Sequence, residues 1–276
     1  MFSEIIKNVR NNTPLVHNIT NYVTVNDCAN ILLACGGSPI MADDIEEVEE
    51  IVSISSALVI NIGTLNSRTV ESMIAAGKKA NEQGIPVILD PVGVGASKLR
   101  TDTAFRLLDE VKFSVVRGNM SEIKALSKSN VSGSRGVDAN VTDSINEENI
   151  AEVVEYINTL SKKLSMVVAV TGAIDIVADG KKTYVIRNGH PMMGKISGTG
   201  CMLSSTIGAY CGANKDNFID ATAAAVCAMG LCGELAYEKM KKNDDGTSLL
   251  KAHLIDFMSK IDANMLKEGA KFEIKQ

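Results

Sequence analysis

Short runs of apolar residues alternate along the chain with longer segments whose apolar positions recur at helical spacing. Strands are predicted at 57–62, 86–90, 114–117 and 166–170. The helices predicted between them are at 67–83, 101–110 and 147–163. A strand that is apolar at every position is buried on both faces, which is typical of a parallel sheet covered by helices on both sides. The pattern therefore predicts an α/β fold.

Two further predicted strands follow each other without a helix. They are at 175–178 and 182–187 and flank Asp179-Gly180, a dipeptide that strongly favours a tight hairpin. We therefore expect an antiparallel edge beyond the parallel part of the sheet. The last third of the chain is predicted to be helical at 200–210, 217–240 and 248–265.

The composition favours one large domain over two small ones. The 276 residues are 45% hydrophobic, which suffices for a sizeable core, and only 4% aromatic, so that core must be largely aliphatic. No linker rich in Pro, Gly or Ser divides the chain, and the polar stretch 127–148 is typical of a surface insertion. Whether its part at 127–142 forms a lid or a solvent loop stays open. We expect a single domain over residues 1–276.

Charge and cysteine content argue against several classes of protein. A formal net charge of −5 with scattered basic pairs does not suit nucleic acid, which requires a basic face. The six cysteines form no CxxC motif, which argues against zinc and favours reduced, buried thiols. The first residues lack the apolar core of a signal peptide, and no run of about 18 apolar residues predicts a membrane span. We expect a cytoplasmic protein that binds neither nucleic acid nor membranes.

The segments at which the predicted strands end are polar or rich in glycine. They are at 61–64, 90–93, 117–119 and 171–172. In open parallel sheets, ligands bind beyond the carboxyl ends of the strands, and all these ends lie on one edge. We therefore expect the four segments to contribute to one site.

The run 196–205 joins a loop of small residues to the start of a predicted apolar helix. Gly198 and Gly200 have no side chain, so the backbone is free to adopt positive φ there and to approach a ligand closely. The free N–H groups and the dipole of the following helix favour an anion, and phosphate suits them best. Cys201 follows at the rim, where a reacting hydroxyl would lie. Taken alone, the run also fits a plain loop before a core helix.

The segment 117–122 has a structural and a functional interpretation. Asn119, followed three residues later by Glu122, has the pattern of a capping box at the start of a helix. The functional interpretation assigns Glu122 to a water bound to Mg²⁺ and Arg117 to a nucleotide phosphate. Both interpretations stay open.

Asp90 and Thr171 end two other predicted strands. Asp90 is the natural second acid for a Mg²⁺ ion, which takes one or two carboxylates and keeps several waters; it also fits a helix cap or a turn before Pro91. Thr171 suits either a hydrogen bond to phosphate or a closed turn. The chain has no convincing Ser-His-Asp or Cys-His arrangement, and it lacks a GxSxG elbow, a P-loop and a GxGxxG motif after the first strand.

The N-terminal third indicates a different kind of ligand. Apolar residues mix with amide and hydroxyl groups at 14–23, and a tight loop is expected at 36–42. Such a lining suits a small, partly apolar and uncharged ligand. Met41 is well adapted to a flat heterocycle, although it also fits an ordinary core. His17 is more typical of a structural histidine than of a catalytic base.

Seven motifs follow one another in a specific order. They are HNITNYV at 17–23, SPIMA at 38–42, NIGTL at 61–65, DPVGVGAS at 90–97, RGNMSEI at 117–123, VTGAIDIV at 170–177 and ISGTGCMLS at 196–204. Together they resemble the motifs of the hydroxyethylthiazole kinase family of thiamin salvage, within the ribokinase-like superfamily. The resemblance covers 15–237, and seven motifs in order are far more specific than any one of them.

The resemblance implies a fold and a reaction. The fold is a ribokinase-like three-layer sandwich, in which a mostly parallel central sheet has helices on both faces and an antiparallel edge hairpin. The reaction is the phosphorylation of the primary hydroxyl of 4-methyl-5-(2-hydroxyethyl)thiazole, with ATP as co-substrate and Mg²⁺ as cofactor. Members of the family are typically homotrimers with active sites at their subunit interfaces.

Individual roles carry over from the family to matching positions. The substrate-binding residues implied are Met41, Gly198 and Asn21, the ATP-binding residues Arg117 and Thr171, and the metal-binding residues Glu122 and Asp90. The metal role of Glu122 follows from the match of NMSE to the NxxE motif of the superfamily. Asp90 is the second acid on the basis of its predicted position.

One position departs from the superfamily. Most members have GTGD, with the aspartate as the base on the attacking hydroxyl, whereas this chain has Cys201, as thiazole kinases do. A thiol with a pKa of about 8.5 is a weak base, although a helix N-terminus lowers that value. We expect Cys201 to orient the hydroxyl, and the amides of Gly198, Thr199, Gly200 and Cys201 to hold the charge that develops on the transferred group.

Three other functions are alternatives. A kinase of the same fold that acts on hydroxymethylpyrimidine, pyridoxal or a sugar is disfavoured by Cys201 and the SPIMA segment. The ATP- or ADP-dependent dehydratase that repairs hydrated NAD(P)H generally keeps GTGD, so the same cysteine disfavours it. A non-catalytic nucleotide-binding module is disfavoured by the intact Arg117, Glu122 and GTG loop.

Overall fold

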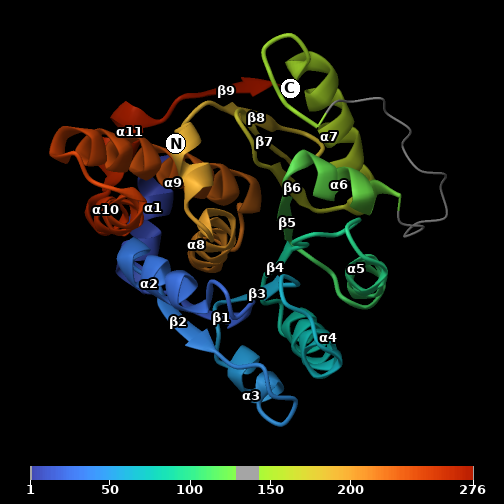
Figure 1. Cartoon of the computed structure of the whole chain (residues 1–276). Coiled ribbons are helices and arrows are strands. Elements are labelled where there is room, and N and C mark those ends of the chain that lie inside the picture. Colours follow the sequence, from blue (N-terminus) through green and yellow to red (C-terminus); the bar gives the residue numbers. More distant parts are fainter. Residues whose placement is uncertain (1, 129–142, 276) are drawn as a thin grey trace.

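The computed structural model describes residues 2–128 and 143–275, and within them nine strands form one sheet in the order β2-β1-β3-β4-β5-β6-β7-β8-β9 (Figure 1). The strands are β1 (Leu15–Ile19), β2 (Ser38–Met41), β3 (Ala57–Asn61), β4 (Val87–Asp90), β5 (Val115–Gly118), β6 (Val167–Val170), β7 (Asp175–Ala178), β8 (Thr183–Ile186) and β9 (Phe272–Lys275). The strands from β2 to β6 are parallel, and β7 to β9 are antiparallel. The predicted mixed sheet is confirmed, and its antiparallel part extends to β9, one strand beyond the predicted hairpin.

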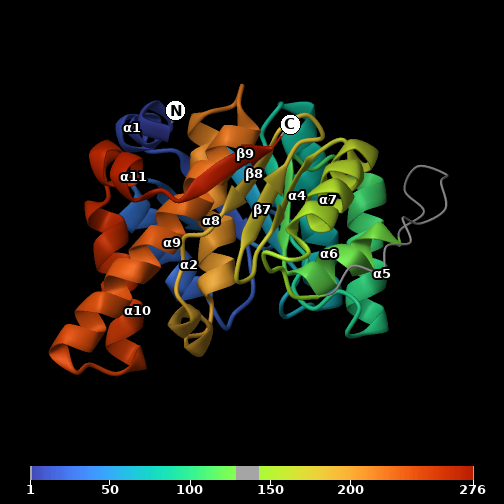
Figure 2. The same cartoon turned by 90° about the horizontal axis from the view of Figure 1, so that it is seen from above.

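Helices cover both faces of this sheet. They are α1 (Phe2–Asn12), α2 (Val25–Cys35), α3 (Val48–Ser53), α4 (Ser67–Glu82), α5 (Lys98–Glu110), α6 (Met120–Ser127), α7 (Ile150–Leu164), α8 (Thr199–Ala213), α9 (Phe218–Asn243), α10 (Thr247–Lys260) and α11 (Ala263–Gly269), with a 3₁₀ turn at Pro191–Lys195. Helices α3 to α7 lie on one face, and α1, α2 and α8 to α11 lie on the other (Figures 1 and 2). The three predicted layers are therefore present.

Successive residues of the central strands point to opposite faces, so each strand contributes to two cores. In β3, Ala57 and Val59 pack with the α8 side, whereas Leu58 and Ile60 pack with the α4 side. This double burial explains why β3 is apolar at every position but the last.

The direction of the chain across the sheet reverses at β1. Helix α2 leads from β1 outward to β2 on one face, and α3 returns the chain to β3 on the other face. Such a reversal leaves a crevice at the carboxyl ends of the two strands beside it, here β1 and β3. The register places Asn61, the last residue of β3, opposite Asp90, the last residue of β4.

The N-terminal third is where the structure differs most from the expectation. The prediction of a tight loop over 36–42 is wrong, because residues 38–41 form the edge strand β2 and pair with residues 15–18 of β1. The apolar pattern also predicts no element before residue 57, whereas the structure has α1, β1, α2, β2 and α3 there. Only the turn at Gly36, with φ of 97°, corresponds to the expected loop.

The helix predicted over 248–265 is two helices. Helix α10 ends at Lys260, and α11 begins at Ala263. The carboxylate of Asp262 accepts hydrogen bonds from the backbone N–H groups of the second and third residues after it and so starts the second helix. The other predicted helices and strands agree with the structure to within a few residues at their ends.

Two regions bear on the expected surface and membrane properties. Residues 129–142, which make up most of the polar stretch 127–148, lie outside the described residues, so the insertion stays a prediction. Helix α9 is long and apolar enough to cross a membrane by length and composition alone, but 83% of its most apolar window is buried within the fold. It packs against β6, β7 and β8.

Candidate active site

Polar side chains meet at the edge of the sheet where the parallel strands end. Asn21, in the turn after β1, donates from Nδ2 to Asn61 Oδ1 at 3.0 Å. Asn61 Nδ2 donates to Asp90 Oδ2 at 2.8 Å, and Arg117 Nη1 of β5 lies 3.7 Å from Asp90 Oδ1. The expected convergence of the strand ends on one site is confirmed.

The N-terminus of α8 lies against this edge. Gly198 caps the helix with φ of 90° in the left-handed region, as predicted for this residue. A Cβ at Gly198 would also lie 2.8 Å from Thr24 Cγ2, so a side chain is excluded for a second reason. Neither Gly198 nor Gly200 places a side chain of its own over the backbone N–H groups of the first turn of α8.

Gly200 is required for space and not for a special backbone conformation. The expectation of positive φ there is wrong, because Gly200 lies in the first turn of α8. A Cβ at this position would lie 2.5 Å from Arg117 Nη1. The absent side chain lets the guanidinium rest directly on the start of the helix.

Two side-chain amides surround the thiol of Cys201. Asn21 Nδ2 and Asn61 Nδ2 both lie 3.3 Å from Sγ and donate to it. The orientation of each amide is fixed by the backbone, since Asn61 Oδ1 accepts from the N–H of Gly63 and Asn21 Oδ1 accepts from the N–H of Thr24. Asn61 was predicted only as part of a polar strand end, because its role depends on partners remote in sequence.

The thiol of Cys201 is a poor source of thiolate in this setting. Burial raises its pKa, and the negative charge of Asp90 raises it further. The side-chain hydrogen bonds of Thr24, Asn21 and Asn61 oppose these effects without overcoming them. The lowering that a helix N-terminus exerts does not dominate here, so Cys201 is protonated at neutral pH.

Asp90 is fully buried and only half satisfied. Its Oδ2 accepts hydrogen bonds from Asn61 Nδ2 and from Ser204 Oγ, both at 2.8 Å. Its Oδ1 has no hydrogen-bond partner among the described residues. Burial raises the pKa of Asp90 against the opposing charge of Arg117. Its carboxylate caps no helix in the described part of the chain, which removes one of the structural interpretations of this acid.

The capping box at α6 is confirmed. Asn119 Oδ1 accepts from the N–H of Glu122, and Glu122 Oε2 accepts from the N–H of Asn119, each at 2.9 Å. Glu122 Oε1 accepts from the N–H of Gly93 at 2.9 Å. The negative charge of Glu122 also raises the pKa of Asp90, so the two acids lie close enough to interact.

These two acids fit a magnesium ion that keeps most of its water. In the part of the chain that the structure describes, no group of three or more His, Cys, Asp or Glu side chains is placed to hold a metal. The free oxygen of Asp90 offers one ligand, and Mg²⁺ is typically bound by one or two carboxylates together with water and phosphate oxygens. The donor set therefore suits Mg²⁺ better than a metal that requires a complete protein cage.

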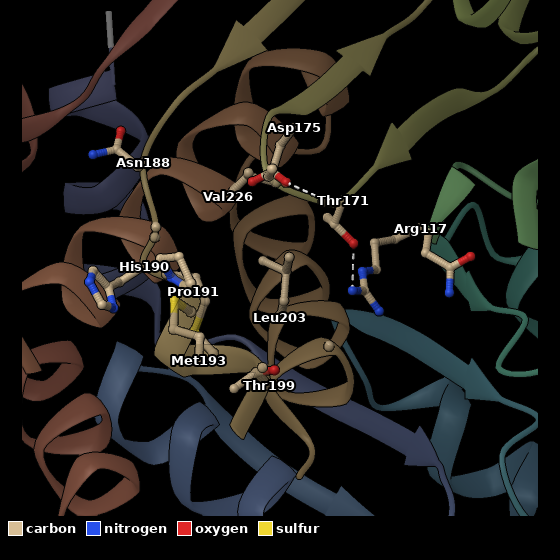
Figure 3. Close-up of a pocket in the computed structure, with 18 residues that line it drawn as sticks. Arg117, Thr171, Asp175, Asn188, His190, Pro191, Met193, Thr199, Leu203 and Val226 are labelled. Carbon is tan, nitrogen blue, oxygen red and sulfur yellow. Dashed lines mark hydrogen bonds between the residues drawn. The ribbon is translucent and has the colours of Figure 1, made fainter. Parts of the chain in front are cut away.

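A cavity of about 490 Å³ opens on one side of the N-terminus of α8 (Figure 3). At one end, Arg117 Nη2 donates to Thr171 Oγ1 at 2.6 Å, beside Thr199 and Gly200. Arg117 Nε is buried and has no partner among the described residues. A guanidinium with free donors beside a helix N-terminus suits phosphate.

The other end of the cavity is apolar and carries a ring. Pro191 and Met193 lie there beside His190, across from Arg117, and Leu203 and Val226 lie between the two ends (Figure 3). The imidazole of His190 stacks on Tyr237 with the ring centroids 3.5 Å apart. Neither His190 nor Asp175, which lies between the two ends, was predicted as a site residue.

The first turns of α8 have the cavity on one side and the polar strand ends on the other. Thr199, Gly200 and Leu203 line the cavity. Cys201 and Ser204 instead face the amides and Asp90 at the strand ends. A ligand in the cavity and a ligand at Cys201 would therefore meet at the helix N-terminus.

Met41 ends the edge strand β2 and is partly buried. It lies opposite Asn18 of β1 in the register. His17 is fully buried and its Nε2 donates to the carbonyl of Ala42 at 2.8 Å, which fixes the residue that follows Met41. Burial lowers the pKa of His17, so it is a neutral structural histidine. Met41 does not line the cavity on the Arg117 side.

Comparison with known proteins places this chain in a family. A sequence model of the hydroxyethylthiazole kinase family matches residues 6–264. Hydroxyethylthiazole kinase of Clostridium acetobutylicum is 57% identical over 273 residues, which cover 99% of both chains. The chain belongs to the hydroxyethylthiazole kinase family.

Solved structures agree with this assignment. The hydroxyethylthiazole kinase protein of Pyrococcus horikoshii has a TM-score of 0.87 and 37% identity, and the match covers 100% of this chain and 99% of that one. A ribokinase-like superfamily protein of Enterococcus faecalis has a TM-score of 0.60 at 14% identity, over 94% and 89% of the two chains, and so supports the fold alone. The predicted ribokinase-like fold is confirmed, and a kinase of this family takes ATP as its co-substrate.

The contact between Gly200 and Arg117 predicts a selective loss of nucleotide binding. In Gly200→Ala, the new Cβ would displace the guanidinium from Thr171, while the helix gains a residue of higher propensity. We expect the fold to persist and the Kd for ADP, measured by calorimetry, to rise about tenfold, as for the loss of a charged hydrogen bond. In an Arg117→Ala background the same substitution should have no further effect; two fully additive losses would contradict this explanation.

Asp175 predicts an unusual dependence of stability on pH. Burial raises its pKa to about 7 in the folded protein, whereas its ordinary value is 3.8. Between these values the folded state binds more protons than the unfolded state, so the stability that this group contributes is complete below pH 3.8 and is lost as the pH rises through 7. Replacement by a neutral side chain removes this loss.

We therefore expect Asp175→Asn to gain stability over the native chain as the pH rises. The difference in the free energy of unfolding should increase by about 1 to 2 kcal/mol between pH 5.5 and pH 8. Urea unfolding of both chains at the two pH values measures it. A difference that is the same at both pH values would show that the carboxyl titrates near its ordinary value.

Proposed function

We propose that this protein transfers the γ-phosphoryl group of ATP to the primary hydroxyl of 4-methyl-5-(2-hydroxyethyl)thiazole, as a single kinase domain over residues 1–276 in the cytoplasm. The observation that carries the proposal is the N-terminus of α8, whose Gly200 side borders the cavity and whose Cys201 side faces polar groups at the strand ends. A phosphoryl group bound at this N-terminus lies between a nucleotide on one side and an acceptor alcohol on the other.

ATP occupies the cavity with its phosphates toward Arg117 and Thr171. The free donors of Arg117 and the amides of Gly198 to Cys201 hold the phosphoryl oxygens, where charge is spread in the transition state. The alcohol oxygen forms a bond to the γ-phosphorus, the bond from that phosphorus to the β–γ bridging oxygen breaks, and ADP leaves. The hydroxyl proton is released to solvent.

Asp90 and Glu122 hold Mg²⁺, Asp90 through its free oxygen and Glu122 through water. The ion, when bound, neutralises charge on the phosphates. Support comes from the buried Oδ1 of Asp90, which accepts no hydrogen bond within the described residues and lies 3.7 Å from Arg117 Nη1, and from the proximity of the second acid.

The thiazole alcohol binds on the Cys201 side. Met41 offers a thioether to the flat ring, Asn21 an amide, and Gly198 a bare stretch of backbone. Two amide donors already occupy the lone pairs of the Cys201 sulfur, so the hydrogen of the thiol is what it can offer to the hydroxyl. Cys201 then orients the alcohol and is at most a weak base.

The chain forms homotrimers with the active sites at subunit interfaces. Support comes from apolar side chains that a single chain leaves in solvent close to the acceptor side. Tyr22 and Val23, next to Asn21, are 80% and 60% exposed. Neighbouring exposed apolar side chains of this kind are typical of contact surfaces.

The first test is the production of ADP from ATP and Mg²⁺ with and without the thiazole alcohol, with the product mass measured alongside. We expect ADP only when the alcohol is present, a product heavier by one phosphoryl group, and loss of the reaction on removal of Mg²⁺ by a chelator. ADP production that instead depends on hydroxymethylpyrimidine, or conversion of hydrated NADH, would keep the fold and overturn the proposed substrate.

The role of Cys201 is tested by two substitutions. Cys201→Asp should retain or raise kcat, because a carboxylate is ionised near neutral pH and can accept the hydroxyl proton, whereas the thiol of Cys201 is protonated. Cys201→Ala should lower kcat by less than about 100-fold, which is below the full contribution of a general base. Complete loss of activity in both variants, with thermal unfolding unchanged, would mean that the thiol itself is indispensable.

A further inference from the structure

Asp175 is the one acid that lines the cavity within the described residues. It is the first residue of β7, and its side chain turns back toward the loop from β6. Its Oδ1 accepts the N–H of Gly172 at 2.8 Å, which fixes the carboxylate beside Thr171. Among the described residues, Oδ2 has no hydrogen-bond partner. One oxygen is thus used by the loop, and the other is available to a ligand in the cavity.

The place of Asp175 along the cavity indicates which part of a nucleotide it meets. The phosphate end is marked by Arg117 and Thr171, and the apolar end by Pro191, Met193 and the ring of His190. Asp175 lies between these ends, next to Thr171 and Val226 (Figure 3). A nucleotide that runs from the phosphate end to the apolar end places its ribose at this point.

We propose that Asp175 binds the ribose of the nucleotide, with Oδ2 accepting a hydrogen bond from the 2′- or 3′-hydroxyl, and that it sets a preference for ribonucleotides over deoxynucleotides. This rests on the proposed function only in taking a nucleotide as the occupant of the cavity. A carboxylate suits a sugar diol because it only accepts hydrogen bonds, whereas hydroxyls donate them.

A carboxylate beside a triphosphate carries an electrostatic cost, and two features reduce it. Burial raises the pKa of Asp175 to about 7, so the group is close to half protonated at neutral pH. The charge of Arg117 also acts on Asp175 and offsets part of its negative charge. A neutral carboxyl still accepts a hydrogen bond from a hydroxyl through its carbonyl oxygen.

The test compares kcat/KM for ATP, 2′-deoxyATP and 3′-deoxyATP in the native chain and in two variants. Asp175→Asn keeps the acceptor for Gly172 and directs an NH₂ group at the ribose, and Asp175→Ala removes both contacts. Because the comparison is a ratio within each variant, a partly unfolded sample does not distort it. The matched control is Asp179→Asn, at the other end of β7, whose Oδ1 also accepts backbone N–H groups in a turn and does not line the cavity.

In the native chain and in the Asp179→Asn control we expect ATP to be favoured about tenfold or more over at least one deoxynucleotide, as for a hydrogen bond to a charged group. In Asp175→Ala and Asp175→Asn the preference should fall below about threefold. A native chain that does not discriminate, or a preference that survives in Asp175→Ala, overturns the proposal. So does a change in the ATP to GTP ratio with an unchanged deoxynucleotide ratio, which would place the base at Asp175.

Binding without acceptor separates this proposal from the proposed function. Calorimetry with Mg²⁺ and either ADP or 2′-deoxyADP or 3′-deoxyADP requires no alcohol. A difference in affinity that depends on Asp175, found in a protein that does not phosphorylate the thiazole, keeps the ribose contact and overturns the substrate. Phosphorylation of the thiazole with deoxynucleotide ratios that do not depend on Asp175 keeps the substrate and overturns the ribose contact.

Discussion

The side-chain amide of Asn61 connects the segments from which the site is built. It donates to Asp90 and Cys201, and it accepts from Asn21 and from the backbone of Gly63. An amide engaged on both of its ends cannot rotate without leaving buried polar groups unpaired, which is costly. The positions of the acid, the thiol and the turn after β1 are therefore set by one residue, which is itself fixed as the last residue of a central strand.

The parts of the fold that the sequence predicts are those encoded by neighbouring residues. The strands from β3 to β6 begin with runs of apolar residues, and the capping box at Asn119 needs only two residues within one turn. β1 was not predicted because His17 and Asn18 break its apolar pattern although both are buried. Their partners, the carbonyl of Ala42 and the hydroxyl of Ser205, are remote in sequence. Buried polar residues that are satisfied by tertiary contacts hide a strand from such an analysis.

The same distinction separates the predicted site residues from those that were missed. The segments that end parallel strands were predicted to meet because topology alone brings them to one edge. The reason for glycine at 200 was not predictable, because it depends on where the guanidinium of Arg117 lies in the folded protein. Asn61 and Asp175 lie within motifs that the sequence analysis quotes. Their roles, however, follow from which of their side-chain atoms already have hydrogen-bond partners in the folded protein. Motifs identify the segments of a site, and only the hydrogen-bond partners identify the tasks within it.

The charges around the cavity explain how an acidic chain accommodates a polyanion. Asp90, Glu122 and Asp175 lie near one cation, Arg117, which by count gives an excess of negative charge. Burial raises the pKa of Asp175 to about 7, so a bound proton removes part of its negative charge at neutral pH. What remains for phosphate is the guanidinium of Arg117 and the backbone amides at the start of α8. The electrostatic cost of placing phosphate in this cavity therefore falls when Asp175 is protonated, and the pKa of about 7 places this change near neutral pH.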